Sequence, residues 1–297
     1  AAEGTKEVRL VDVAETHHGG AHFFLNRRAN CGCAFIETLE KKGEDRARSR
    51  SRVKTHRDVG NHPQGALRTC DELIHALNRA GYDRQIGAIV LAGAGDKAFC
   101  TGGDQSAHEG QYDGRGTIGL PMEELHAVLR DVPKPVIARV QGYAIGGGNV
   151  LCTICDLTIA SEKAVFGQVG PKVGSVDPGY GTALLARVVG EKKAREMWYL
   201  CRRYSAAEAL AMGLVNVVVP HEQLDAEVQR WCDEIQGKSP TAIAIAKRSF
   251  NMDTAHQAGI AGMGMYALKL YYDTEESREG VRAFQEKRKP DFRSKQV

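Results

Sequence analysis

Over most of the chain, apolar residues occur either at helical spacing or in short continuous runs. This pattern predicts strands that alternate with helices. Leu73, Ile74 and Leu77 share one face of a helix expected over 69–80, and Gly81 is a plausible stop for it. The run 87–93, GAIVLAG, is continuously apolar and bounded by glycines, which is typical of a strand covered on both faces. The other expected helices span 122–130, 146–155, 181–189, 192–201, 222–236 and the region 240–287, and the other expected strands span 135–140, 157–160, 164–166 and 214–219.

Strands that alternate with helices imply a mainly parallel sheet with crossover connections, which is α/β architecture. Repeated short units of two strands and a helix favour a spiral of stacked turns over a single open sheet. Helices dominate after residue 220. We therefore divide the chain into an atypical N-terminal segment (1–68), a core (69–220) and a C-terminal helical region (221–297).

The N-terminal segment lacks the regular pattern of the rest. Residues 40–58, EKKGEDRARSRSRVKTHRD, contain almost no large apolar side chain and cannot bury enough surface to offset the entropy of ordering them. We expect this stretch to be solvated or disordered. Upstream of it, only 8–13 and 21–25 have the composition of short strands.

Composition places the chain among ordinary globular proteins and excludes several classes of partner. Of 297 residues, 42% are hydrophobic and 26% are charged, which allows one large domain or two small ones. The 40 basic and 37 acidic residues nearly balance, so the overall field gives no reason to expect a nucleic-acid partner. No apolar run approaches the roughly 20 residues that cross a bilayer, and the N-terminus has no signal-peptide pattern. We expect a cytoplasmic protein without membrane contact.

Eight cysteines are spread along the chain without the spacing of a small secreted disulfide framework. Cys152 and Cys155 have the spacing of a redox pair, but they fall inside an apolar helix-like stretch, which favours buried, reduced thiols. Cys31 and Cys33 lack the two further ligands that a zinc site requires. We therefore expect no metal.

The first candidate site is a glycine-rich segment, 99–105, that follows the apolar strand at 87–93. Its glycines let backbone N–H groups approach a ligand, and an N–H aimed at a carbonyl oxygen stabilises developing negative charge. A tight turn without a ligand would explain a Gly-Gly pair equally well. Beside Gly103, we take four residues of this segment as substrate-binding candidates: Thr101, Gly102, Asp104 and Gln105.

The second candidate segment, 141–149, reads QGYAIGGGN and joins the apolar strand 136–140 to an apolar helix. Three glycines at a helix start cost that helix roughly 1 kcal/mol each, so a compensating role is expected. A helix N-terminus offers free N–H groups and the positive end of a dipole, which suit an oxyanion. The dinucleotide and P-loop spacings are both absent. Tyr143 and Gly146 are further substrate-binding candidates.

The third candidate segment, 166–181, contains too many glycines and prolines for a regular element but carries polar side chains that can act on a proton. If its backbone is extended, Ser175 and Asp177 project to the same side, where a hydroxyl and a carboxylate can share one water. Taken alone, Asp177 is better explained as the cap of the helix that follows.

These three segments, in this order, resemble the crotonase (enoyl-CoA hydratase/isomerase) superfamily from about residue 69 to the C-terminus. The runs CDLTIASEKAVFGQVGPKVGSVDPGYGTA and GEKKAREMWYLCRRY resemble the branch that contains 1,4-dihydroxy-2-naphthoyl-CoA synthase and 2-ketocyclohexanecarboxyl-CoA hydrolase. The compact QSAHEGQYDGRGTIGLPMEELH and the later KRSFNMDTAHQAGIAGMGMYALKLYYDTEES are more similar to the hydrolase, and the synthase usually has Trp at the position of Tyr180. The resemblance implies a crotonase-like spiral of ββα units with a C-terminal helical trimerisation region.

The resemblance also implies roles for individual residues. Gly103 and Gly147 match the two N–H donors of an oxyanion hole for a coenzyme A thioester. Ser175, Asp177 and Tyr272 match polar active-site residues, although Tyr272 alone reads as a helix-face aromatic. The implied reaction is hydrolytic opening of 2-oxocyclohexane-1-carboxyl-CoA to pimeloyl-CoA, a reverse Dieckmann cleavage in anaerobic degradation of benzoate-like acids.

Other implied roles concern ligands and assembly. Gln168 and Gly170 match positions at which the synthase holds a bicarbonate ion as base, and the need for that ion in this chain is open; no cofactor is otherwise implied. Lys287 matches a basic residue near the coenzyme A phosphates. The family generally forms trimers or hexamers, so a homo-oligomer is expected.

The chain departs from the family in residues 1–68, where crotonases normally have two strands and a segment that frames the coenzyme A pocket. One hypothesis is a reading-frame slip upstream of about Arg68; the alternative is a divergent extension. Two other functions remain open. One is the ring closure catalysed by the naphthoyl-CoA synthase, and the other is a catalytically silent binding protein whose Arg-rich tract contacts RNA, against which the balanced charge argues.

Overall fold

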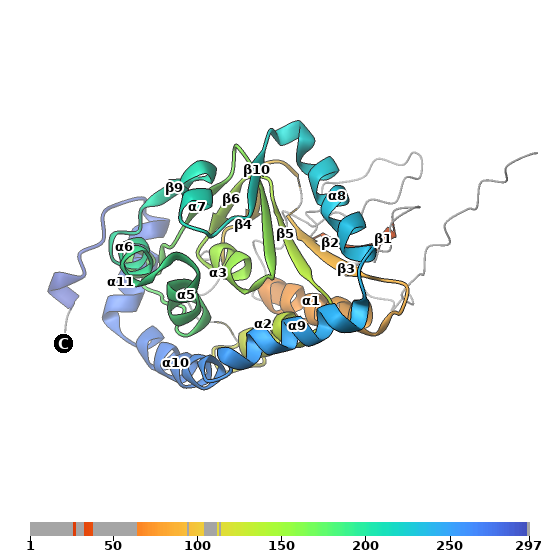
Figure 1. Ribbon diagram of the computed structural model, residues 1–297. Coiled ribbons are helices and arrows are strands. Elements are labelled where there is room, and N and C mark those ends of the chain that lie inside the picture. Colours follow the sequence, from red (N-terminus) through yellow and green to blue (C-terminus); the bar gives the residue numbers. More distant parts are fainter. Residues whose placement is uncertain are drawn as a thin grey trace, which may run out of the picture.

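A computed structural model describes residues 26–27, 33–37, 64–93, 95–103, 112 and 114–295, with side chains from residue 69 onward (Figure 1). The strands predicted over 8–13 and 21–25 and the Arg-rich stretch 40–58 lie outside the described residues. So do the candidates Asp104 and Gln105.

The larger sheet has six strands in the order β1-β2-β3-β5-β7-β10, and its neighbours are parallel except for the antiparallel pair β1 and β2. Its strands are β1 (Asn26–Arg27), β2 (Cys33–Glu37), β3 (Ala88–Ala92), β5 (Val136–Val140), β7 (Leu157–Ser161) and β10 (Val217–Val219). All five side chains of β3 are buried, as its continuous apolar run predicts.

The smaller sheet has four strands in the order β4-β6-β8-β9. They are β4 (Ala98–Cys100), β6 (Tyr143–Ile145), β8 (Val165–Gly167) and β9 (Arg203–Ser205), and only the pair of β8 and β9 is antiparallel. Along the chain, a strand of the large sheet is followed by a short strand of the small sheet and then a helix. The predicted spiral of ββα units is therefore confirmed.

Helices cover both faces of the larger sheet, and alternate residues of its strands face different helices. Ala88 and Val90 of β3 pack with Leu224 and Val228 of one helix, α8, whereas Ile89 belongs to the main core on the other face. The helices up to this point are α1 (Gln64–Tyr82), α2 (Met122–Asp131), α3 (Gly147–Ile154), α4 (Gly170–Val173), α5 (Leu185–Val189), α6 (Glu191–Leu200), α7 (Ala206–Ala211) and α8 (Leu224–Gln236).

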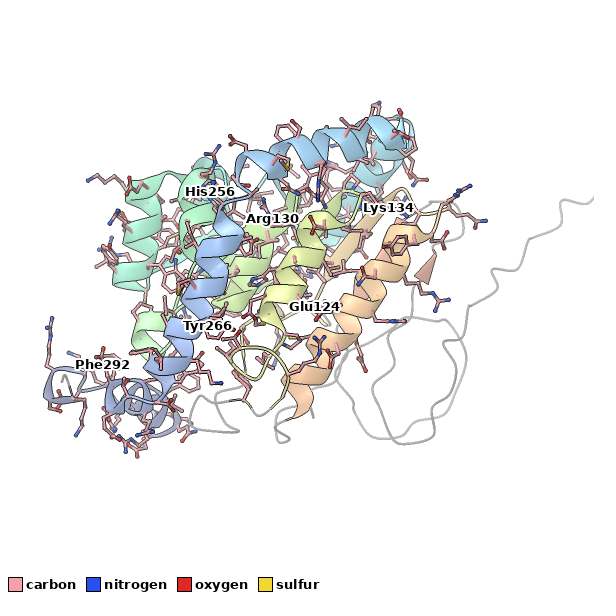
Figure 2. The ribbon with its side chains drawn as sticks, turned by 90° about the horizontal axis from the view of Figure 1, so that it is seen from below. Glu124, Arg130, Lys134, His256, Tyr266 and Phe292 are labelled. Carbon is pink, nitrogen blue, oxygen red and sulfur yellow. The ribbon has the colours of Figure 1, made fainter. Side chains whose placement is uncertain are left out.

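The helical region predicted over 240–287 consists of three separate helices. They are α9 (Pro240–Asp253), α10 (Gln257–Tyr272) and α11 (Glu275–Gln285). Figure 2 shows that α9 and α10 follow one another and that the chain bends between them at His256. Lys247 of α9 is buried, and its ammonium donates to the carboxylate of Asp156 at 2.7 Å and to the carbonyl oxygens of Leu129 and Lys134 at 3.0 and 2.9 Å. This contact fixes α9 to the start of β7.

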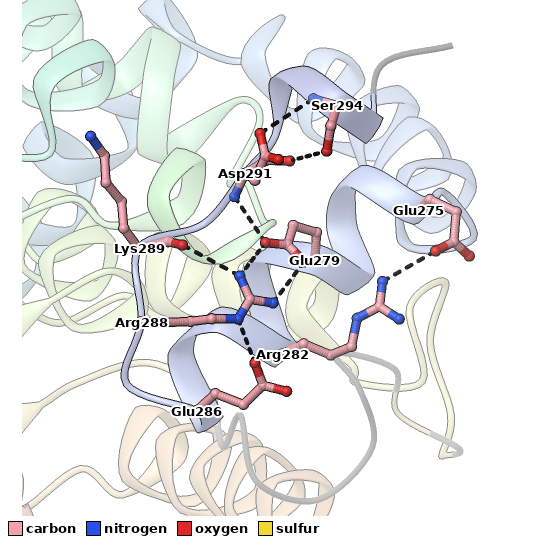
Figure 3. Close-up of polar contacts among 8 residues, drawn as sticks. All are labelled: Glu275, Glu279, Arg282, Glu286, Arg288, Lys289, Asp291 and Ser294. Carbon is pink, nitrogen blue, oxygen red and sulfur yellow. Dashed lines mark hydrogen bonds and ion pairs between the residues drawn. The ribbon is translucent and has the colours of Figure 1, made fainter.

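The C-terminal tail folds back on α11 through a cluster of charged residues (Figure 3). Arg288 makes a bidentate ion pair with buried Glu279, at 2.5 and 2.9 Å, and the N–H of Asp291 donates to the same carboxylate at 2.8 Å. The hydrogen bonds from Arg288 lower the pKa of Glu279 to about 2. The turn between α11 and Arg288 forces Lys287 into a left-handed conformation, with φ of 54°.

Several short elements differ from the sequence-based expectation. β1, β2, β4, β6, β9, α4 and α7 were not predicted, because each is two to six residues long and too short for a periodic pattern. The helix α4 lies within 166–181, where no regular element was expected. The helix expected over 181–189 begins as a π-helical turn, Tyr180–Leu184, before α5. Among the described residues, no helix is long and apolar enough to cross a membrane, and no three metal-ligating side chains gather at one place.

Candidate active site

The fold brings the two glycine-rich segments into direct contact. Residues 101–103 leave the end of β4, and Gly147 begins α3 directly after β6. A Cβ atom on Gly147 would lie 3.3 Å from the Cα atom of Gly102, and one on Gly102 would lie 3.3 Å from the backbone nitrogen of Gly147. Gly102 also has φ of +91°, which side-chain-bearing residues rarely adopt. The two segments meet this closely because neither carries a side chain.

The second segment is held in place by the neighbouring strand and the first one. Gly146, with φ of +58°, caps α3, and its N–H donates to the carbonyl oxygen of Gly167 at 2.9 Å. A Cβ on Gly148 would lie 2.0 Å from the carbonyl oxygen of Cys100, so this position also requires glycine. The N–H of Gly147 belongs to the first turn of α3, where the helix itself supplies no acceptor and the dipole favours negative charge. The expected oxyanion donor thus lies at the contact between the segments.

The third segment begins next to the second, because Gly167 at the end of β8 pairs with Ile145 of β6. Gln168 follows and is 1% exposed, and neither atom of its side-chain amide has a hydrogen-bond partner among the described residues. Gly170 is packed so tightly that a Cβ would lie 2.5 Å from the carbonyl oxygen of Ser175 and 2.9 Å from the ring of Trp198. A buried amide without a protein partner is costly, so a water or a small polar ligand would stabilise this position.

Ser175 and Tyr272 meet across 97 residues of sequence, with 2.9 Å between their hydroxyl oxygens. Tyr272 is the last residue of α10 and is buried in a cluster with Ile118 and Leu120. Burial raises the pKa of the Tyr272 hydroxyl; the hydrogen bond with Ser175 lowers it, and the charge of Asp177 raises it further. Tyr272 is thus buried against Ser175 and is not an exposed aromatic on the face of α10. This position favours its interpretation as a residue of the site.

Asp177 caps the turn that follows it and also has a carboxyl group with a raised pKa. Its carboxylate accepts the N–H of Gly181 at 2.9 Å, which caps the π-helical turn as the sequence suggested. The half-buried carboxyl is also largely desolvated. Burial raises its pKa to about 7, despite the opposing effect of the Gly181 N–H. A carboxylate of this pKa can accept and return a proton near neutral pH.

The remaining sequence candidates lie at the surface. Thr101 is exposed beside the glycine contact, and Tyr143 of β6 is 42% exposed, with the guanidinium of Arg203 5.6 Å from its ring centroid. Lys287 is exposed just beyond α11, next to the residues drawn in Figure 3. These positions suit contacts with the outer parts of a large ligand.

The sequence analysis did not identify Tyr112. A Cβ on Gly103 would lie 1.9 Å from the Tyr112 hydroxyl oxygen, so this hydroxyl sits directly against the expected oxyanion donor. Tyr112 lies nine positions after Gly103 in the sequence, and neither periodicity nor motif marks it. Only the folded chain places it at the site.

Comparison with known proteins agrees with this geometry. The model of the enoyl-CoA hydratase/isomerase family matches residues 65–295. An enoyl-CoA hydratase from Mycobacterium avium subsp. paratuberculosis K-10 is similar over 92% of this chain and 98% of its own, with 26% identity and a TM-score of 0.73. One from Bacillus anthracis is 28% identical over 89% of this chain and 96% of its own, with a TM-score of 0.64. A carnitinyl-CoA hydratase from Mycobacterium avium, at 24% identity, 93% and 100% coverage and a TM-score of 0.73, shares the fold.

The family match, the fold and the geometry of the site all indicate an enzyme that binds a thioester. Two glycine segments that meet at a helix N-terminus suit the carbonyl oxygen of a thioester, and the family model extends over both of them and over the loop that carries Ser175 and Asp177. The chain therefore belongs to the enoyl-CoA hydratase/isomerase family, the crotonase superfamily, and processes coenzyme A thioesters with a crotonase-like fold.

Proposed function

We propose that this enzyme hydrolyses a carbon–carbon bond, opening 2-oxocyclohexane-1-carboxyl-CoA to pimeloyl-CoA in anaerobic degradation of benzoate-like acids in the cytoplasm. The observation that carries the proposal is Asp177, a carboxyl whose pKa is raised to about 7 and whose charge acts on Tyr272, the partner of Ser175. Hydrolysis of a β-keto thioester requires a base for water and an acid for the carbon that leaves. These three residues supply both.

The first step is addition of water to the ring ketone. Ionised Asp177 takes a proton from a water that the Ser175 hydroxyl orients, and the hydroxide forms a bond to the ketone carbon to give a tetrahedral alkoxide. When the alkoxide collapses, the bond between the ketone carbon and the carbon that carries the thioester breaks. Its electron pair becomes the thioester enolate, whose oxygen lies at the N–H groups of Gly103 and Gly147.

The second step returns the proton. Tyr272 donates its hydroxyl proton to the enolate carbon, and Asp177 restores it through Ser175, consistent with the 2.9 Å contact between the two hydroxyls. The sum is addition of one water, which gives a carboxylic acid and an intact thioester. Because the same carboxyl accepts and then returns the proton, a pKa near the working pH is favourable at both stages.

The buried amide of Gln168 fits a small oxyanion such as bicarbonate, because both of its polar atoms lack partners in the described structure. Gln168 and Gly170 would hold such an ion, which would supply a base. The proposed hydrolysis does not depend on it, since Asp177 already provides a carboxylate. The same amide favours a second candidate function, the ring-closing naphthoyl-CoA synthase reaction, in which that ion acts as the base.

We further propose that the outer part of the coenzyme A moiety lies against the exposed residues Thr101 and Tyr143, and that Lys287 reaches the coenzyme A phosphates at the site of a neighbouring subunit. We also propose a homo-oligomer, a trimer or hexamer, because α9 and α10 carry a large set of exposed apolar side chains. Those side chains are Ile245, Phe250, Met252, Ile260, Met263, Tyr266 and Leu270. Figure 2 shows Tyr266 on the outer side of α10.

The test is incubation of the enzyme with each candidate thioester while products are followed by mass. The proposal expects 2-oxocyclohexane-1-carboxyl-CoA to gain the mass of one water, and the ring-closing substrate of naphthoyl-CoA synthase to remain unchanged. Loss of water from the second substrate, without hydrolysis of the first, would instead establish the ring-closing reaction.

A further inference from the structure

We infer that Tyr112 is a catalytic residue whose hydroxyl donates a hydrogen bond to the thioester oxygen, beside the N–H of Gly103. The inference rests on the proposed function for the identity of the substrate, but only on the thioester itself for the hydrogen bond. An ideal Cβ on Gly103 would lie 1.9 Å from the Tyr112 hydroxyl oxygen and 3.1 Å from the ring carbon that bears it. The hydroxyl therefore occupies the space that any side chain at position 103 would need.

The turn that follows Tyr112 packs against its backbone. A Cβ on Gly119 would lie 2.1 Å from the carbonyl oxygen of Tyr112, and the N–H of Gly114 donates to the carbonyl oxygen of Gly119 at 3.2 Å. Gly119, with φ of +76°, thus closes a tight turn against the tyrosine backbone. The side chain is placed by packing and by this turn.

The ring of Tyr112 joins the two halves of the site. It packs against the cluster that contains Ile118, Leu120 and Tyr272, together with Val176, which lies between Ser175 and Asp177 in the chain. Its hydroxyl meets the oxyanion segment at Gly103. Tyr112 therefore packs on the cluster that contains Tyr272, while its hydroxyl lies at Gly103.

This position suits a donor that stabilises charge without transferring its proton. Negative charge appears on the thioester oxygen when the carbon–carbon bond breaks, and a phenol O–H is a stronger donor than a backbone amide. Tyr272 is placed differently, because its hydroxyl lies at Ser175 and that of Tyr112 lies at Gly103. In this arrangement Tyr112 donates a hydrogen bond to the thioester oxygen, and Tyr272 protonates the enolate carbon.

The test replaces Tyr112 by Phe, which keeps the ring, and measures two properties. Turnover of 2-oxocyclohexane-1-carboxyl-CoA is expected to fall about 10- to 100-fold in kcat, with KM changed less than about threefold. The second property is the absorption of bound 2,4-hexadienoyl-CoA, whose conjugated carbonyl absorbs at longer wavelength when it is polarised. The variant is expected to lose a large part of the red shift seen with the parent enzyme.

A matched control is Tyr82→Phe, because Tyr82 at the end of α1 is 85% exposed and has no part in the proposed site or interface. It should leave both properties unchanged. Gly103→Ala provides a second check: its loss of turnover should be smaller in the Tyr112→Phe background than in the parent, because the hydroxyl that blocks the new Cβ is gone. If Tyr112→Phe unfolds, 3,5-difluorotyrosine at position 112 keeps the shape while strengthening the donor, and the red shift should increase when it is measured at about pH 5.5, where this more acidic phenol keeps its proton.

The outcomes separate this inference from the proposed function. If the parent enzyme does not hydrolyse the ketone but Tyr112→Phe still loses the red shift, the substrate is wrong and the hydrogen bond stands. If the parent is active and the folded Tyr112→Phe variant keeps both turnover and red shift within twofold, or if the fluorinated enzyme shows no increase in the red shift, the inference is overturned.

Discussion

Replacing Asp177 by Asn should make the protein more stable and nearly inactive at once. Asn keeps an oxygen that can accept the N–H of Gly181, now at 2.9 Å, so the cap of the π-helical turn remains. It cannot ionise, so it cannot accept a proton from water. We expect turnover of 2-oxocyclohexane-1-carboxyl-CoA to fall at least 100-fold, while the dissociation constant of a non-reactive acyl-CoA changes less than threefold.

The gain in stability follows from the raised pKa. Burial moves the pKa of Asp177 from 3.8 to about 7. Between these values the folded protein binds more protons than the unfolded chain, so the free energy of unfolding falls as the pH rises. At about 1.36 kcal/mol per pKa unit, the full penalty above pH 7 is at most about 4 kcal/mol, and about 3 kcal/mol of it develops between pH 5 and pH 8.5.

Urea unfolding at pH 5 and pH 8.5 measures this effect. Asp177→Asn should gain up to about 3 kcal/mol more at the higher pH than at the lower one. Asp131→Asn is the control, because that carboxylate is 64% exposed in an ion pair with Arg248 and should change stability by less than about 1 kcal/mol at either pH. A variant that keeps a tenth of the parent turnover, or a stability effect that is equal at both pH values, would refute the reasoning.

Three further predictions follow from the same structure. In the parent enzyme, kcat/KM should rise about tenfold per pH unit below about 7 and level off above it, as Asp177 ionises; a profile that is flat from pH 5.5 to 8.5 would count against this base. Gly147→Ala should lower kcat about 100-fold or more in steady-state assays, because its Cβ pushes against Gly102, whereas Gly259→Ala, with nothing within 4 Å, should stay within twofold. Lys247→Met should cost about 3–5 kcal/mol in urea unfolding, because it leaves a carboxylate without its buried partner, and an effect below about 1 kcal/mol would contradict the assigned contact.

The sequence predicted those elements whose pattern is long or continuous. The strand at β3 and the helix at α2 were placed within a residue or two, because one is an unbroken apolar run and the other has clear helical spacing. The strand β6 was missed, since three residues between glycines carry no period. β2 was missed for a related reason: it lies in a segment of weak pattern, and only its pairing with β3 makes it a strand.

The candidate site was predictable in its backbone and only in part in its side chains. The glycine segments stand out locally, because several glycines at a helix start need a reason. Ser175 and Tyr272 are 97 residues apart, and no periodicity predicts that their hydroxyls meet; family resemblance supplied that pair. Neither a local sequence pattern nor the family resemblance pointed to Tyr112. Its role depends on a turn at Gly119 that returns the chain to Gly103.

The proposal that water breaks the carbon–carbon bond is tested most directly by isotope labelling. The enzyme is incubated with 2-oxocyclohexane-1-carboxyl-CoA in H₂¹⁸O, and the product is analysed by mass spectrometry before and after removal of coenzyme A. The account predicts pimeloyl-CoA with one ¹⁸O from the hydrolytic water in the new carboxyl group and none in the thioester, after correction for exchange of the ketone oxygen in enzyme-free controls. Release of free coenzyme A with ¹⁸O at the former thioester, or return of the unopened ring, would contradict it.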